Sequence, residues 1–185
     1  MDKDFSIAVV VEHDQNGVKP VTYEVINAAQ KIGSPITAYY FSNNPEVDPQ
    51  ELIWRGADQV RICIHADYKN YIHETYAAGL VNQINKTRPK LILLSASNNG
   101  KELTAEVAAK LQVCLATDCI ELQCSKDGQV IVKRPIFSGK AQSAGRLSGP
   151  HPYLVTLRPN VFRGGDVDKT RNGEVIRENI ILPDF

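Results

Sequence analysis

The stretch Ile7-Ala8-Val9-Val10-Val11 places five apolar residues in succession, with no polar residue between them. A strand with one face in water would alternate apolar and polar side chains, so this run is typical of a strand that is covered on both faces. Strands of that kind belong mainly to parallel sheets, which carry helices on both sides. The sequence therefore predicts a parallel sheet that begins near residue 7.

Outward from this run, short apolar segments alternate with helical patterns. Gly33 is expected to end the first helix in a left-handed conformation, and Asp48-Pro49-Gln50-Glu51 reads as the start of a short helix. The pattern predicts strands at 35–41, 60–64, 91–94 and 153–157, and helices at 20–32, 48–56, 69–86 and around 103–111. Such repeated strand and helix units indicate an α/β protein with an open, doubly wound, mainly parallel sheet.

One segment departs from this alternation. Residues 120–124 and 130–133 flank Lys126-Asp127-Gly128, and an Asp-Gly pair between two apolar runs signals a β-hairpin. An antiparallel hairpin is therefore expected beside the parallel sheet.

The length of 185 residues fits one domain. We expect the folded unit to cover residues 1–162. The remainder, 163–185, is rich in glycine and charged residues, and it reads as a linker-like tail.

The charge balance excludes several partner classes. The chain has 21 basic and 21 acidic residues, so the composition shows no bias toward nucleic acid. Its longest apolar run is far shorter than the roughly 20 residues that span a bilayer, so membrane insertion is not expected. The start, Met1 to Phe5, has no basic, signal-like character and is expected to lead directly into the first strand. A cytoplasmic protein is the expectation.

No residue pattern forms a complete catalytic or metal site. The four cysteines include no Cys-x-x-Cys pair and are expected to be reduced, mostly buried thiols without a metal. His13 stands between Glu12 and Asp14, but neighbours on an extended chain point to opposite sides, so a solvated loop histidine is favoured over a general base. The sequence therefore predicts a protein that is not an enzyme on its own.

One strand-to-helix loop is a candidate phosphate site, because the free N–H groups at a helix start can hold an anion. The candidate residues are Ser97, Asn98, Asn99, Gly100 and Lys101. The loop lacks both the dinucleotide fingerprint and a Walker-A motif. A capped, solvated turn without a ligand is the alternative.

Two arginine-proline segments are candidate interfaces. They contain Arg134 and Phe137 in the first segment, and Arg158 and Phe162 in the second. Arginine and aromatic residues are enriched at binding hot spots. The alternative is that the arginines lie on the surface and bind backbone carbonyls.

Four segments, by their residues and their order along the chain, resemble the N-terminal domain of the electron transfer flavoprotein alpha subunit. They are Val11-Glu12-His13, Leu115-Ala116-Thr117-Asp118-Cys119, the run from Arg134 to Ala141 and the run from Thr156 to Phe162. The stretch from Ser97 to Leu103 also looks like that family's strand-to-helix loop, and the resemblance covers nearly the whole chain. Ser138 and Asn160 depart from it, because the family usually has glycine there.

The resemblance implies a fold similar to adenine nucleotide hydrolases and universal stress proteins. It implies a docking domain for an electron transfer flavoprotein beta subunit, within a carrier that passes electrons from dehydrogenases or a nicotinamide to a quinone or another redox partner. In that family a second domain holds most of the FAD, and the sequence is expected to lack it, so no FAD is expected on this chain alone. The alternative is a free-standing adenine-nucleotide-binding module like the universal stress proteins.

Overall fold

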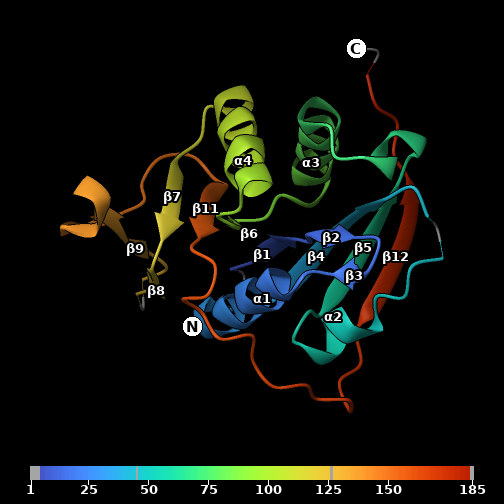
Figure 1. Cartoon of the computed structure of the whole chain (residues 1–185), viewed down its shortest axis with the longest axis horizontal. Coiled ribbons are helices and arrows are strands. Elements are labelled where there is room, and N and C mark those ends of the chain that lie inside the picture. The colour runs from blue at the N-terminus through green and yellow to red at the C-terminus, as the bar shows by residue number, and fades with distance from the viewer. Residues whose placement is uncertain (1–4, 45, 126, 184–185) are drawn as a thin grey trace.

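Seven strands form a sheet through the middle of the molecule, and every neighbouring pair runs parallel (Figure 1). The computed structural model describes residues 5–44, 46–125 and 127–183. The strand order is β12-β5-β4-β1-β6-β11-β7. These strands are β1 (Ile7–Val10), β4 (Ile36–Ser42), β5 (Gln59–Ile64), β6 (Leu91–Ser95), β7 (Leu115–Cys119), β11 (Tyr153–Leu157) and β12 (Glu174–Asn179). The predicted fold class is confirmed.

Helices cover both faces of the sheet, with α1 and α2 on one side and α3 and α4 on the other (Figure 1). They are α1 (Pro20–Ile32), α2 (Gln50–Trp54), α3 (His73–Thr87) and α4 (Asn98–Leu111). Strand β1 serves both layers, because Ile7 and Val9 pack in the apolar cluster of α1 while Ala8 and Val10 pack in that of α3. This is why its sequence shows no polar alternation.

The ends of two helices differ from the predictions. Gly33 follows α1 with φ 169° and ψ −167°, which is extended backbone, so the prediction of a left-handed end is wrong. The chain passes from helix to strand without the sharp reversal that needs glycine. The helix predicted from residue 69 starts at His73 instead, because Ala66–Lys69 form a separate 3-10 turn, η1. Ile72, the residue directly before α3, is 47% exposed.

A three-stranded antiparallel sheet stands beside the main sheet, and we call it, with its short turn, the arm. The arm consists of β8 (Glu121–Cys124), β9 (Val130–Ile136), the 3-10 turn η2 (Phe137–Gly139) and β10 (Ala141–Arg146). The predicted hairpin is confirmed as β8 and β9. The third strand was not predicted, since all six of its residues are exposed and show no apolar alternation. Lys126 of the predicted turn, and residues 1–4 before the first strand, lie outside the described residues.

The predicted linker-like tail, 163–185, contains a strand of the main sheet. After β11 the chain crosses the outer side of α1 and α2, where Asn27 Nδ2 donates to Arg163 O at 2.7 Å. It then forms β12, which pairs with β5 over six residues. The prediction missed this strand because β12 is an edge strand and half of its residues are exposed. Residues 184–185 are outside the described part, and the boundary of the domain stays a prediction.

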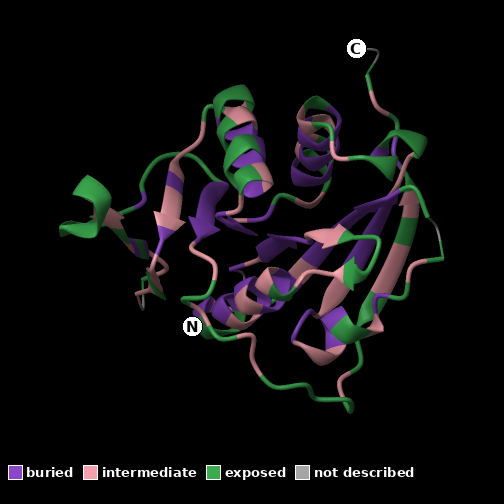
Figure 2. Ribbon diagram, viewed as in Figure 1, coloured by how far each residue is buried: buried purple, intermediate pink, exposed green. Residues whose placement is uncertain are grey.

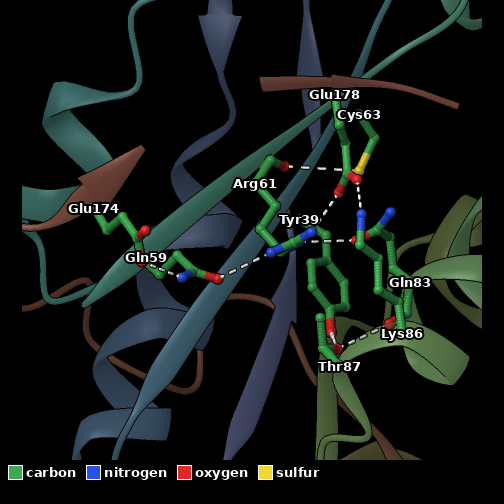
Figure 3. Close-up of polar contacts among 9 residues, drawn as sticks. All are labelled: Tyr39, Gln59, Arg61, Cys63, Gln83, Lys86, Thr87, Glu174 and Glu178. Atoms are coloured by element: carbon green, nitrogen blue, oxygen red, sulfur yellow. Dashed lines mark hydrogen bonds and ion pairs between the residues drawn. The ribbon is translucent and has the colours of Figure 1, made fainter. Parts of the chain in front are cut away.

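A buried ion pair ties β12 to the rest of the sheet (Figure 3). Arg61 on β5 donates from Nη2 to Glu178 Oε1 at 2.6 Å, and the two side chains are 8% and 15% exposed. Arg61 Nε also donates to Gln83 Oε1 on α3 at 2.9 Å, and Lys86 of the same helix pairs with Glu178. Burial by itself raises the pKa of Glu178, but the hydrogen bonds from Lys86 and Arg61 outweigh burial and hold that pKa below its ordinary value. The last strand is thus fixed to both β5 and α3.

Candidate functional site at the carboxyl ends of the strands

A cavity of about 1060 Å³ opens at the carboxyl ends of β1, β4 and β6. Strands β4 and β6 flank β1, and the chain reaches them in opposite directions, so the cavity lies at the topological switch point of the sheet. Open α/β sheets bind ligands at this place. The rim is formed by the short hairpin β2 (His13–Asp14) and β3 (Gly17–Val18), by η1 and by the start of α4.

The candidate phosphate loop forms the start of α4. Ser97 is the N-cap, and its Oγ accepts a hydrogen bond from the Gly100 N–H at 2.9 Å. Asn98 to Lys101 make the first helical turn, and of the five candidates Asn99 and Gly100 line the cavity. Gly100 packs tightly, since an added Cβ would lie 2.0 Å from Ser95 O. A nucleotide role for these residues stays a prediction.

Glu12 places a carboxylate beside this helix start. The Ser97 hydroxyl donates to Glu12 Oε1 at 2.8 Å, across 85 positions of sequence. Burial raises the pKa of Glu12, against the lowering effects of the Ser97 hydrogen bond and the charge of Lys19. A helix start attracts one anion, and here an internal carboxylate stands next to it. A carboxylate here competes with a phosphate for the same helix start, and the nucleotide role of the loop stays a prediction.

His13 is not the solvated loop residue that the sequence favoured. Its side chain is half-buried, its ring stacks on Tyr40 with centroids 4.4 Å apart, and its Nε2 lies 2.6 Å from Phe41 O. Burial lowers the pKa of His13, which favours the neutral ring. The expectation failed because β2 and β3 fold back as a hairpin and carry His13 onto β4. His13 is therefore a packing residue on the wall of the cavity.

Replacing Ser97 with alanine is expected to lower the free energy of unfolding by about 1–2 kcal/mol, since the change removes an N-cap. It also leaves the half-buried carboxylate of Glu12 without its hydroxyl donor. Urea denaturation measures the loss. Asn98→Ala is the control, because Asn98 is exposed in the same turn; equal losses for the two variants would contradict the capping role.

The structure divides the four interface candidates into two groups. Arg134 and Arg158 both reach β7: Arg134 Nη1 lies 3.5 Å from Thr117 Oγ1, and Arg158 Nε donates to Asp118 Oδ1 at 2.9 Å. The hydrogen bond and charge of Arg158 hold the pKa of Asp118 below its ordinary value. Asp118 was not predicted as the partner of Arg158. Because the two residues are 40 positions apart, no local pattern could have shown the pair.

The two aromatic candidates have different surroundings. Phe137 is 76% exposed at the tip of the arm, whereas Phe162 is half-buried and packs against the apolar cluster of α1. An interface role stays a prediction for all four candidates.

The two positions that depart from the alpha-subunit pattern share one backbone conformation. Ser138 has φ 53° and Asn160 has φ 62°, both in the left-handed region that favours glycine. This conformation explains why glycine suits these positions. Asparagine tolerates the left-handed region better than most residues, and serine at 138 carries more strain. Local turn geometry is therefore retained without glycine.

No metal-binding cluster is present among the described residues, where no group of three or more His, Cys, Asp or Glu side chains is placed to hold an ion. All four cysteines are free; Cys63 and Cys119 are buried, and Cys114 and Cys124 are half-buried. Burial raises the pKa of both buried thiols to about 12, so they stay protonated near neutral pH. In the part of the chain that the structure covers, no helix is long and apolar enough to cross a membrane.

A family model and the similar proteins point to the same family. Residues 7–181 match the electron transfer flavoprotein domain. The chain is 32% identical to the electron transfer flavoprotein subunit alpha of Syntrophomonas wolfei over 85% of its own length and 49% of that protein. It is 29% identical to the corresponding subunit of Bacillus subtilis, over 97% of this chain and 55% of that protein.

A further relative carries another name. The chain is 31% identical to the LctC subunit of the lactate dehydrogenase (NAD(+),ferredoxin) of Acetobacterium woodii, over 84% of its own length and 38% of that protein. The chain thus spans about half the length, or less, of these curated relatives.

Proposed function

The chain belongs to the electron transfer flavoprotein domain family, and from that premise we propose that it is the structural and partner-docking domain at the amino end of an alpha subunit. The complete assembly would be an FAD-dependent electron carrier in the cytoplasm. One observation carries this proposal: the match to alpha subunits runs along 85% to 97% of the chain but covers only about half of each of those relatives. Such a partial match is expected of one domain of a longer subunit.

The partners follow from the same premise. We propose that the domain binds an electron transfer flavoprotein beta subunit and supports an FAD-binding domain that lies elsewhere in the complex. A dehydrogenase would supply electrons, and the name of the Acetobacterium relative, a lactate dehydrogenase subunit, supports this. A quinone reductase or another redox protein would accept them. This chain itself contributes no catalytic residue in the proposal.

The geometry of the site supports a role in which this chain binds no nucleotide. Glu12 and Ser97 are bonded to each other at the helix start where a nucleotide phosphate would lie. This arrangement, together with the family match, argues against the alternative of a free-standing adenine-nucleotide-binding module. It agrees with the proposal that FAD is held by another part of the complex.

Calorimetric titration of the purified chain with FAD, AMP and ATP tests this division of roles. We expect no heat of binding at micromolar concentrations for any of the three, because the helix start faces the Glu12 carboxylate. Micromolar binding of AMP or ATP would support the nucleotide-binding alternative. Tight binding of FAD to this chain alone would refute the docking role.

A further inference from the structure

The cavity at the carboxyl ends of the strands has an aromatic wall. Five of the seven tyrosines of the chain line it: Tyr23, Tyr40, Tyr68, Tyr71 and Tyr76. The ring centroids of Tyr71 and Tyr76 are 5.0 Å apart. In Figure 2 the half-buried and exposed residues of the β2–β3 hairpin stand beside the buried strand β1, and this hairpin forms part of the rim. The faces of such rings attract cations.

The cavity also carries more negative than positive side chains. It is lined by four carboxylates, Glu12, Asp14, Asp48 and Glu51, and by two lysines, Lys19 and Lys69. Burial lowers the pKa of His13, which favours its neutral ring. Glu51 pairs with Arg55 at 3.1 Å, which leaves three carboxylates against two lysines. The cavity therefore favours a positively charged ligand over a negatively charged one.

One corner of the cavity already holds a cation that belongs to the chain. The guanidinium carbon of Arg55 lies 4.3 Å from the ring centroid of Tyr23, and Arg55 Nη2 donates to Glu51 Oε1 at 3.1 Å. A carboxylate and a tyrosine ring of the cavity wall thus hold one cation together.

A second carboxylate and tyrosine ring meet at the start of α4. The Ser97 hydroxyl donates to Glu12 Oε1 at 2.8 Å, and the Tyr71 hydroxyl donates to Asn99 O at 3.0 Å, so one helix turn fixes both side chains. Burial raises the pKa of Tyr71, and the nearby charge of Glu12 is among the smaller causes. Among the described residues Glu12 takes part in no ion pair, and Lys19 is not within salt-bridge distance of it. This second corner therefore lacks the cation that the first one has.

We propose that the corner between the Glu12 carboxylate and the Tyr71 ring binds the ammonium group of a small organic amine, whose remaining atoms lie against the tyrosine wall. The start of α4 carries roughly half a positive charge, and the full negative charge of Glu12 exceeds it. A half-buried carboxylate with a single hydroxyl donor gains from a cation as its second partner. The cavity of about 1060 Å³ has room for such a ligand. This inference goes beyond the proposed function and does not depend on it.

Three probes of similar shape and different charge test the proposal on the full-length protein that carries this chain. Benzylamine is positively charged near neutral pH, benzyl alcohol is neutral and benzoate is negatively charged. We expect benzylamine to bind with a dissociation constant below about 1 mM, and the other two at least about tenfold more weakly. Calorimetric titration measures the three affinities, and this comparison needs no variant.

Two variants locate the bound amine. Glu12→Gln keeps an oxygen that can accept from Ser97 but removes the charge, so benzylamine should bind at least about tenfold more weakly and benzyl alcohol as before. Tyr71→Leu removes the ring, and we expect benzylamine to bind about threefold more weakly. Glu174→Gln is the matched control, because Glu174 is an exposed carboxylate on β12 and does not line the cavity. Its affinity should equal that of the wild type.

Four results would overturn the proposal. They are no binding of benzylamine by the wild type, equal affinity for benzylamine and benzyl alcohol, tighter binding of benzoate, and an affinity for benzylamine that Glu12→Gln leaves unchanged. Tighter binding of benzoate would identify an anion site at the helix start instead. An unchanged affinity in Glu12→Gln would place the amine outside this corner. Each of these results leaves the proposed docking role standing.

Discussion

Replacing Glu178 with alanine is expected to lower the free energy of unfolding by about 3–5 kcal/mol, since it removes one partner of a buried ion pair. Arg61 would remain in the interior with its guanidinium facing no carboxylate, because the Arg61 side chain is only 8% exposed. Lys86 loses the same partner. Urea denaturation followed by circular dichroism measures the change.

Glu174→Ala is the matched control on the same strand. The exposed side chain of Glu174 accepts a hydrogen bond from Gln59 Nε2 on the neighbouring strand, so its loss should cost less than about 1 kcal/mol. If both glutamate variants lost the same small amount, the buried pair would not hold β12 in place.

The acid dependence of stability provides an independent check on Glu178. Its pKa in the folded protein lies below the ordinary value of 4.5, so its contribution is present above that pH and is lost as the pH falls through the folded pKa. The wild type should therefore lose more stability than Glu178→Gln between neutral and acidic pH. Parallel curves for the two proteins would show that the pair contributes nothing.

Gly100→Ala is expected to destabilise the domain by at least about 3 kcal/mol, although alanine is the better helix former. The added Cβ would lie 2.0 Å from the backbone oxygen of Ser95, and a backbone atom at the end of a central strand cannot turn aside. The start of α4 would have to move away from β6. Thermal and urea denaturation measure the loss.

The control is Gly145→Ala on β10. No atom lies within 4 Å of the Cβ it would gain, and Gly145 is outside the left-handed region. We expect a change within about 0.5 kcal/mol. A Gly100→Ala variant as stable as Gly145→Ala would mean that the close approach of α4 to β6 is not required.

The sequence predicted those parts of the fold that follow local patterns. Strand β1 was predictable from its unbroken apolar run, and the limits of α1 from its apolar stripe and from Pro20 at its start. Strand β12 was not, since an edge strand buries too little surface to leave a pattern, and its main anchor is Glu178 meeting Arg61 from 117 positions away. The sequence also missed β7, although none of its residues is exposed.

The site was less predictable than the fold. Ser97 as a capping residue could be inferred from its place before a helix, and the structure agrees. The bond from Ser97 to Glu12 and the stacking of His13 on Tyr40 depend on the sheet bringing distant loops together. Both contacts add a carboxylate and a stacked histidine to the cavity wall that no local sequence pattern could have predicted.

The proposed docking role is tested most directly by producing this chain together with its beta subunit and measuring the mass and flavin content of what copurifies. We expect a one-to-one complex of the two proteins, and no flavin on this chain when it is purified alone. Separate elution of the two proteins, or one FAD bound per molecule of the isolated chain, would contradict it.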